Sequence, residues 1–522
     1  MINGDWSSDV CSSDLEKWSI NQYFNDINNP DKDFTISAMD QLVRYLENHN
    51  LYDENPDPLK DIFPNSVIQR MNDKDNEIAS SCFKIIILFA RAYPLELLNS
   101  LFGKVYKFAA EEGLNIITQI SSILREIFVN SKSFDKERRG ILKSIFLDEY
   151  RHFTEIETSE KTVTVFYIET CSYFVDAFYD IMDHNELSVI FDIIKICSSE
   201  HDSEIFNCVV SLTKIFTSKL PKDGEFMNQI IDFLFEMEDL NNAMKMLSAM
   251  ITYKPRNYGI FFEKLINCYI EQLSAIEADY QQYEENQEEY IDIVTDYIQT
   301  ISSLINAFPE KLSKLDKQYP DLQYLESILY FAFNFINYSS IEEPMNLASD
   351  KDDEIVIQND DDSEDFDDDD SMVGGNDESW KIRRAAILLS ENLIKNFPDA
   401  YLEYLRNNDY IDCFLILIHD VENSVQLEAF ELIKIIIKAY GNDELIKKQY
   451  TRWIERIITQ LYIVKKQIIP MALELYSQLV LLKACLPIEL SIKTFTLLNS
   501  IADNVDIRSE ERRVGKECRS RW

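Results

Sequence analysis

Apolar residues recur along most of this chain with the period of an α-helix. They fall three and four positions apart, and few stretches show the alternation that is typical of a half-buried strand. Only 10 glycines and 13 prolines interrupt the 522 residues. The pattern predicts an all-α protein whose helices average roughly 15–20 residues and are joined by short polar links.

Four segments share one pattern, in which an acidic turn precedes a β-branched residue and a second apolar residue follows seven positions later. The β-branched positions are Ile36, Ile78, Ile382 and Val425, and the later positions are Val43, Ile85, Leu389 and Leu432. The first two segments, like the last two, lie about forty residues apart, which is the period of HEAT-type helix hairpins. We therefore predict a HEAT-repeat, armadillo-like α-solenoid of stacked antiparallel hairpins, with an irregular helical bundle as the alternative.

Several of the predicted helices end at similar sequences. An aromatic residue precedes proline or glycine at Tyr93-Pro94, Phe308-Pro309, Phe397-Pro398 and Tyr440-Gly441. Proline cannot continue a helix and glycine commonly ends one, so we expect helix ends there, with the aromatic ring beneath the turn. Between about residues 132 and 239 the repeat pattern is faint, and the hairpins cannot be counted.

A strongly acidic segment interrupts the helical pattern. Residues 350–378 contain fifteen acids and one lysine, a net charge of −14. Such a composition cannot bury enough apolar surface to offset the entropy of ordering, so we predict a disordered acidic loop over 341–377. A helix is expected to follow, with Asp377, Glu378 and Ser379 placed to cap its start.

Acidic residues dominate the charge of the whole chain. Lys+Arg 51 against Asp+Glu 92 gives −41, and −27 remains without residues 350–378 (−41 + 14). This charge argues against nucleic acid or a membrane as partner and favours basic protein surfaces. Two short basic clusters are expected to be solvated helix faces: Lys136, Arg138 and Arg139, and Lys381, Arg383 and Arg384.

The nine cysteines contain no CxxC pair, and most lie in apolar runs. This usage predicts buried free thiols in a reducing compartment. The start of the chain lacks the apolar core of a signal peptide, and apolar runs such as 85–90 are too short to cross a membrane. We expect a soluble intracellular protein.

No catalytic or metal-binding motif is present. The five histidines are scattered, and neither HExxH, GxSxG nor a P-loop sequence occurs. His419, before Asp420 and Glu422, is the nearest approach to an acid–base cluster, and we interpret it as a solvated or capping residue. Trp380 is expected to anchor its helix in the core. The sequence therefore predicts no enzyme activity, no cofactor and no metal.

The two ends differ from the rest of the chain. Residues 1–15 and 508–522 lack a helical apolar period and resemble translated sequencing adapter, so we set them aside. The domains predicted are an N-terminal HEAT-repeat arch over 16–340, the acidic loop over 341–377 and continuing HEAT repeats over 378–507.

The acidic segment followed by Ser379-Trp-Lys-Ile-Arg-Arg-Ala-Ala386 resembles the cullin-associated, neddylation-dissociated proteins, also called TBP-interacting proteins. Ile27-Asn-Asn-Pro-Asp-Lys-Asp-Phe34 and Met71-Asn-Asp-Lys-Asp-Asn-Glu-Ile78 resemble the first two hairpins of that family. The resemblance covers roughly 19–507 and is weak in the middle. The residues that carry the motif are Ser379, Trp380, Lys381, Ile382, Arg383 and Arg384.

The resemblance implies a non-catalytic regulator of cullin–RING ubiquitin ligases. Members of the family wrap around unneddylated cullin with its RING subunit and promote exchange of substrate adaptors. It implies one copy per cullin–RING complex, in cytoplasm and nucleus, with an acidic concave surface facing basic residues. This chain would carry only the first arch. Within it, the resemblance places the RING-side contact around Lys32, Asp33, Asp73, Lys74 and Asp75.

Two alternatives remain open from the sequence. Importin-β-type nuclear transport receptors are also acidic HEAT solenoids with an acidic loop, and RanGTP binding would distinguish them. The other alternative is a helical scaffold without any role at cullins.

Overall fold

The computed structural model describes most of the chain. The described residues are 26–49, 62–112, 114–155, 160–200, 202–222, 224–278, 286–338, 378–408, 410–463, 468–482, 491–492 and 495–496. The segments predicted over 1–15, 341–377 and 508–522 therefore lie outside the described residues. The described residues form α-helices and short 3-10 helices and contain no strand, as predicted.

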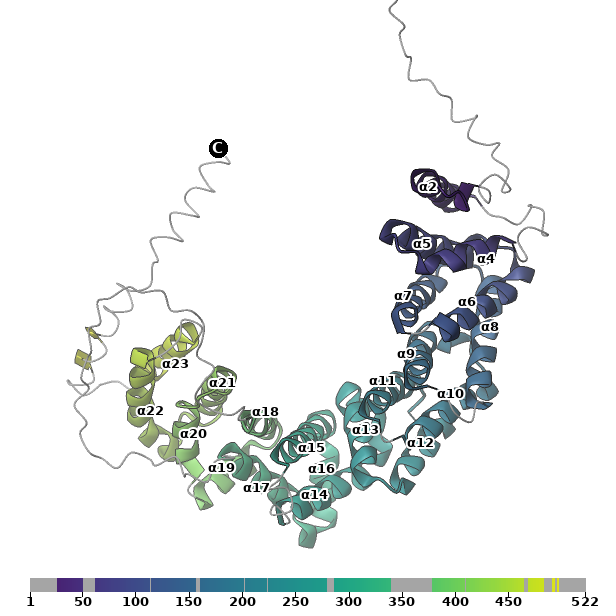
Figure 1. Ribbon diagram of the computed structural model, residues 1–522. Helices are drawn as coiled ribbons and strands as arrows, with labels where there is room; N and C mark the ends of the chain where they lie inside the picture. Colours follow the sequence, from purple (N-terminus) through teal and green to yellow (C-terminus); the bar gives the residue numbers. More distant parts are fainter. Residues whose placement is uncertain are drawn as a thin grey trace, which may run out of the picture. The chain divides into compact units, whose positions relative to one another are not determined.

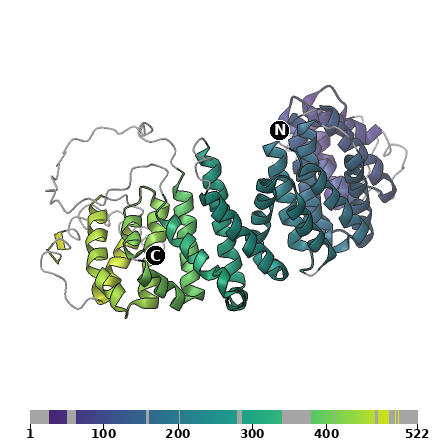
Figure 2. The same ribbon diagram turned by 90° about the horizontal axis from the view of Figure 1, so that it is seen from below.

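The chain divides into two compact units, one up to Tyr253 and the other from Lys254 onward. Each unit is built from helix hairpins in two layers (Figures 1 and 2). We call the layer of first helices the A layer and the layer of second helices the B layer. The residues that precede and follow 339–377 pack together in the second unit, because α17 contacts α18 there.

In the first unit, neighbouring hairpins stack layer on layer. The A layer contains α4 (Ile62–Gln69), α6 (Leu98–Glu112), α8 (Lys136–Glu155), α10 (His184–Cys197) and α12 (Glu225–Glu236). The B layer contains α2 (Lys32–Asn48), α5 (Asn76–Ala92), α7 (Leu114–Ser131), α9 (Lys161–Phe178), α11 (Ser203–Lys219) and α13 (Leu240–Tyr253). Short 3-10 helices are η2 (Arg70–Asn72), η3 (Leu95–Leu97) and η4 (Tyr179–Ile181).

The second unit repeats this arrangement with longer connections. Its A layer contains α14 (Phe262–Ala278), α17 (Tyr324–Ile336), α19 (Pro398–Asn407), α20 (Cys413–Leu417) and α22 (Glu444–Ile463). Its B layer contains α15 (Gln287–Ala307), α18 (Trp380–Asn396), α21 (Asn423–Tyr440) and α23 (Ile469–Leu482). The connections include α16 (Pro309–Gln318), η5 (Pro255–Phe261), η7 (Pro320–Leu322) and η8 (Tyr410–Asp412).

The predicted helix ends are confirmed. α5 ends at Ala92, α15 at Ala307, α18 at Asn396 and α21 at Tyr440. The rings of Tyr93 and Tyr440 are buried, as expected, whereas those of Phe308 and Phe397 are only half-buried. Proline at the next position then starts the following helix, because its fixed φ suits the first helical turn.

The repeat pattern is correct for three of its four segments. Ile78, Ile382 and Val425, with the residues seven positions later, are buried in the core. In the first segment Ile36 and Val43 are partly exposed, and Thr35 and Leu42 are buried instead. The alignment was wrong there because Asp31 caps α2, whereas Asp75, two residues later than the Asp-Lys-Asp alignment implies, caps α5.

Candidate protein-binding surface

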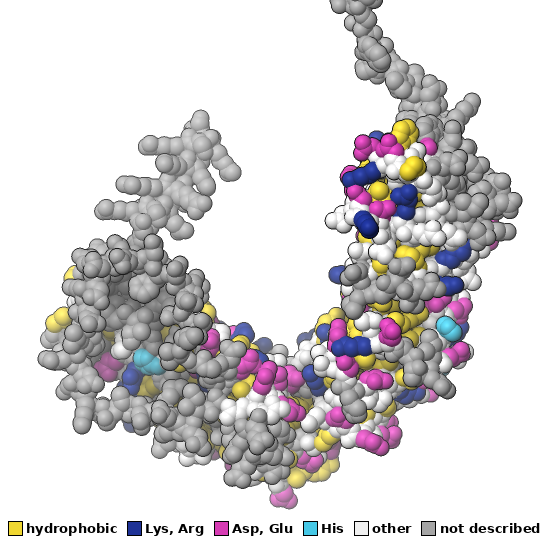
Figure 3. Space-filling model, viewed as in Figure 1, with side chains coloured by type: hydrophobic (Ala, Val, Ile, Leu, Met, Phe, Trp, Pro, Cys, Tyr) yellow, Lys and Arg dark blue, Asp and Glu magenta, His cyan; other side chains and the backbone are white. Residues whose placement is uncertain are grey.

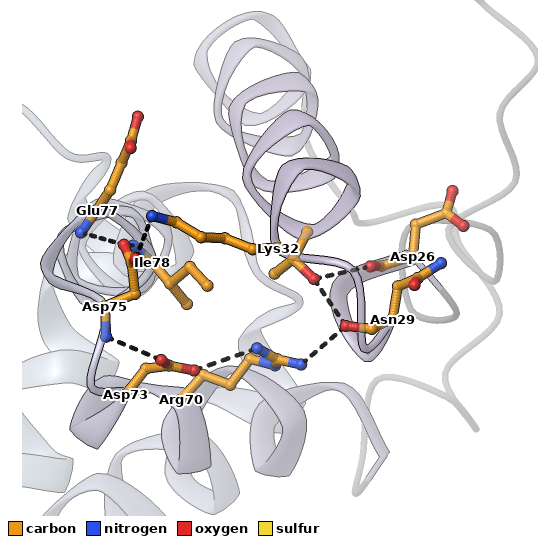
Figure 4. A network of polar contacts seen from close by, with 9 residues as sticks. Asp26, Asn29, Lys32, Arg70, Asp73, Asp75, Glu77 and Ile78 are labelled. Atoms are coloured by element: carbon orange, nitrogen blue, oxygen red, sulfur yellow. Dashed lines mark hydrogen bonds and ion pairs between the residues drawn. The ribbon is translucent and has the colours of Figure 1, made fainter.

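The first two hairpin turns of the first unit are joined by a polar network (Figure 4). The ammonium of Lys32, at the first position of α2, contacts the carboxylate of Asp75, which also caps α5. Arg70 binds Asp73 at 3.2 Å, and Asp73 accepts a hydrogen bond from the backbone N–H of Asp75 at 3.0 Å. The Asp75 carboxylate therefore joins two turns, and the Asp73 carboxylate orders its own turn.

The shared hydrogen bond changes the acidity of both partners. It raises the pKa of Lys32 and lowers the pKa of Asp75, even though both lie at the surface. The charged forms are therefore favoured, and the contact will weaken as salt screens it. This network gives Lys32, Asp73 and Asp75 partners within the chain.

The other two residues predicted for partner contact take no part in this network. Asp33 and Lys74 are exposed, and within the described part of the chain neither side chain makes a hydrogen bond or ion pair. The structure thus brings three of the five predicted residues into one intramolecular network. It leaves Asp33 and Lys74 as the two that face solvent beside that network.

A second pair of turns repeats the same contact, which sequence analysis missed. Lys161, at the first position of α9, binds the α11 cap Asp202 at 2.9 Å and Glu204 at 2.9 Å. In both cases a lysine that begins one B-layer helix binds the capping aspartate of a later B-layer helix. The signal available in sequence was the spacing, roughly forty residues, between such a lysine and the next capping aspartate.

The motif at the start of α18 contains a buried arginine. Arg383 donates to both carboxylate oxygens of Asp420, at 2.6 and 3.0 Å. It also donates to the Ser379 hydroxyl at 2.6 Å and to the Tyr338 carbonyl at 3.0 Å. Arg383 thus joins the residues on both sides of 339–377 to the next A-to-B turn. We call this group, comprising Arg383, Asp420, Ser379 and the Tyr338 carbonyl, the Arg383 clasp.

The clasp corrects two sequence predictions. Arg383 is buried rather than part of a solvated face. Ser379 precedes α18, but its backbone is helical (φ −55°, ψ −23°) and its side chain makes no capping hydrogen bond. Its hydroxyl accepts from Arg383. Glu378 does not cap the helix either in the contacts described, and it pairs with Lys381. Asp377 lies outside the described residues.

The other motif residues are held by neighbouring helices. Lys381 reaches Asp292 of α15 at 3.2 Å, and Arg384 reaches Glu428 of α21 at 3.1 Å. Ile382 is fully buried, whereas Trp380 is only half-buried, so the ring does not form the core anchor expected. The motif therefore connects its helix to the repeats on both sides.

The other basic cluster also differs from the prediction. Arg138 is buried at the start of α8 and donates to the carbonyls of Ala90 at 3.0 Å and Tyr93 at 2.7 Å. These carbonyls end α5, where a cation is favourable. Arg139 pairs with Asp180 at 2.5 Å, and only Lys136 is exposed as expected.

An acidic group lies on the B layer of the second unit. Glu391 of α18 lies near Glu428 and Glu431 of α21, and burial followed by these two charges raises its pKa to about 7. Lys434 offsets part of the charge, because it pairs with Glu431 at 2.8 Å and Glu474 at 2.9 Å. Figure 3 shows acidic and basic side chains interspersed over one face of the molecule.

The described residues offer little for catalysis. Asp420, beside His419, is occupied by Arg383, and burial lowers the pKa of His419. No group of three or more His, Cys, Asp or Glu within the described residues is arranged to hold a metal ion. Burial raises the pKa of Cys82 and of Cys197 to about 12, so these thiols are unreactive in the folded state. None of the helices described is both long and apolar enough to cross a membrane.

Comparison with known proteins supports the fold and no finer assignment. A scan of the sequence against protein-family models gives no match, and a search of curated proteins gives none either. Among solved structures, a crystal structure of importin beta is similar with a TM-score of 0.51 and 11% identity, over 87% of this chain and 51% of that one. A multiply substituted Kap121p is similar with a TM-score of 0.51 and 9% identity, over 88% of this chain and 41% of that one.

These likenesses identify the fold as a HEAT-repeat α-solenoid, in agreement with the prediction. This chain spans about half the length of the importin beta structure and less of the Kap121p structure. At 9–11% identity these likenesses describe the fold alone.

Proposed function

We propose that this chain is a non-catalytic regulator of cullin–RING ubiquitin ligases. It would bind unneddylated cullin with its RING subunit, one copy per complex, in cytoplasm and nucleus. By covering the site of modification it would influence the assembly of SCF-type complexes and the exchange of substrate adaptors.

One observation carries the proposal. The sequence Ser379-Trp-Lys-Ile-Arg-Arg, which resembles the cullin-associated family directly after an acidic segment, begins α18 inside a hairpin of a HEAT solenoid. Arg383 of this motif is built into the Arg383 clasp. The net charge of −41 also suits a partner rich in Lys and Arg.

The N-terminal turns supply the residues to test. Asp33 and Lys74 are exposed beside the network of Lys32, Asp73 and Asp75, so a partner can reach them without breaking that network. In this proposal, Lys32, Asp73 and Asp75 hold the turns in place, and Asp33 and Lys74 contact the RING side.

The test is a pull-down of the full chain with purified cullin–RING, with and without its ubiquitin-like modifier, and with RanGTP in parallel. We expect retention by unmodified cullin–RING alone, and weaker retention of a variant that carries Asp33→Lys and Lys74→Glu. The exposed pair Glu137→Lys and Lys136→Glu on α8 is the matched control, since it makes the same charge exchange elsewhere.

Other outcomes lead to other conclusions. Equal binding of modified and unmodified cullin–RING would contradict masking of the modification site. Retention by RanGTP would instead favour a nuclear transport receptor, the alternative that shares the fold of importin beta. Retention in no lane would remove the cullin proposal and leave a scaffold for other proteins.

A further inference from the structure

Three tyrosines gather on the A layer of the second unit. Tyr404 of α19 and Tyr410 of η8 have ring centroids 6.1 Å apart and planes only 5° from parallel. Both rings also stack on buried Phe333 of α17, at 5.5 and 5.0 Å. Tyr330, one turn before Phe333, is 39% exposed, and the other two tyrosines are half-buried. The rings are thus fixed from beneath and accessible from outside.

Two carboxylates lie beside these rings. Glu277 of α14 accepts a hydrogen bond from the Tyr330 hydroxyl at 2.7 Å and another from the Asn334 amide. Glu326 is exposed on α17, one turn before Tyr330. Among the described residues, neither glutamate has a Lys or Arg partner, and the basic residue in α19, Arg406, is paired with Asp443.

Burial and the nearby carboxylates raise the pKa of two of these tyrosines. The hydrogen bond to Glu277, followed by burial, raises the pKa of Tyr330 to about 12. Burial, Tyr410 and Glu326 together raise the pKa of Tyr404. Glu277 thus places a negative charge beside Tyr330, and Glu326 places one beside Tyr404, which strengthens the attraction of these aromatic faces for a cation.

We propose that this tyrosine–glutamate face, formed by Tyr330, Tyr404, Tyr410, Glu277 and Glu326, binds a basic segment of a partner protein through an arginine side chain. A guanidinium group is planar, so it can stack on a tyrosine ring while its N–H groups reach a carboxylate. Nucleic acid and anionic lipid are disfavoured, because their phosphates would meet Glu277 and Glu326. The surface lies on the A layer of the second unit and includes none of the five predicted RING-side residues, so it does not rest on the cullin proposal.

The experiment uses the full chain and a fluorescein-labelled peptide of alternating Arg and Ser, with binding followed by fluorescence anisotropy near physiological salt. The double variant Tyr404→Ala/Tyr410→Ala leaves the net charge unchanged, so any loss reports the rings rather than the acidity of the chain. We expect it to bind roughly five- to tenfold more weakly. Tyr404→Phe/Tyr410→Phe should bind within about twofold of the original, since the rings remain.

Two further variants and a second peptide test whether the loss of binding is specific to these rings and to arginine. Tyr330→Ala changes a more exposed ring and should also weaken binding, while Tyr253→Ala removes an exposed ring in the first unit and should not. A matched peptide of Lys and Ser should bind the original chain several-fold more weakly than the Arg peptide.

The proposal is overturned if both alanine variants, Tyr404→Ala/Tyr410→Ala and Tyr330→Ala, bind as the original does. It is also overturned if the Phe variant loses as much as the Ala variant, or if Lys and Arg peptides bind equally. Retention of cullin–RING by the Tyr404→Ala/Tyr410→Ala variant, measured in the same preparation, distinguishes failure of this face from failure of the cullin proposal.

Discussion

Two contacts between neighbouring turns use the same kind of charge pair in opposite environments. In the first unit, the side chains of Lys32 and Asp75 are 56% and 24% exposed, whereas those of Arg383 and Asp420 in the second are 6% and 1% exposed. Water already satisfies the charges of a surface pair, so that pair adds little stability. Removing one partner of a buried pair leaves the other charge without solvent or counter-charge. The comparison predicts that only the second contact is indispensable.

The largest effect is expected from Arg383→Ala. It leaves the Asp420 carboxylate buried without its partner and should lower the free energy of unfolding of the second unit by about 3–5 kcal/mol. Urea unfolding followed by tryptophan fluorescence measures this, since Trp453 is buried in the same unit. Arg384→Ala, the adjacent and more exposed pair, is the control and should cost about 0–1 kcal/mol. Equal losses in the two variants would refute the comparison.

An intermediate effect is expected from Glu391→Gln. Because the pKa of Glu391 is raised from 4.5 to about 7, the ionised carboxylate destabilises the folded state. The penalty is absent below about pH 4.5, grows as the pH rises and is complete above about pH 7, following the same two pKa values. The variant should therefore be more stable at pH 8 by about 1–3 kcal/mol and nearly equal at pH 4.5.

The measurement for this variant is chemical unfolding at pH 4.5, 6 and 8. Glu403→Gln changes an exposed carboxyl on α19 and serves as the matched control. A stabilisation of Glu391→Gln that does not depend on pH would show that its ionisation is not the cause.

A small effect is expected from Lys32→Ala, with Tm within about 2 °C of the original at physiological salt. Asp75→Ala should lower Tm further, because Asp75 also caps α5. Since the pKa of Asp75 is lowered in the fold, its contribution is present at neutral pH and is lost as the pH falls through that lowered value. Differential scanning fluorimetry at low and high salt checks this, and a Lys32→Ala loss that salt leaves unchanged would contradict a surface pair.

The smallest effect is expected from deleting residues 350–375. Their composition predicts little packing, and the deletion keeps Tyr338, Ser379 and Arg383 of the Arg383 clasp. Tm should be nearly unchanged, and a drop of more than several degrees in thermal unfolding would show that the segment stabilises the fold.

The fold could be predicted from sequence because its signals are local. The helical spacing of apolar residues predicts where the helices lie, and a proline or glycine after an aromatic residue predicts where they end. Both signals involve only residues close together in the sequence. The first repeat was misaligned because two Asp-Lys-Asp turns look alike in sequence but use different aspartates as caps. The hairpins between about residues 132 and 239 could not be counted because the repeat pattern is faint there.

The candidate surface was harder to predict, because its contacts join residues far apart. Charged side chains usually face solvent, so Arg138 and Arg383 were assigned to solvated faces. Their burial depends on carbonyls and a carboxylate 37 to 48 residues away, which no local pattern reveals. The tyrosine–glutamate face likewise draws on four different elements. For the five predicted contact residues, the structure shows a network that holds three of them and the exposure of Asp33 and Lys74, and the contact with a partner stays a prediction.

The buried cysteines allow the opening of each unit to be measured separately. Cys82, Cys171 and Cys197 are buried in the first unit and Cys413 in the second. A thiol reagent reaches such a side chain only when the surrounding helices separate, so its labelling rate measures the population of that open state. Mass spectrometry of the labelled peptides would therefore give a separate opening free energy for each half of the chain, without any engineered probe.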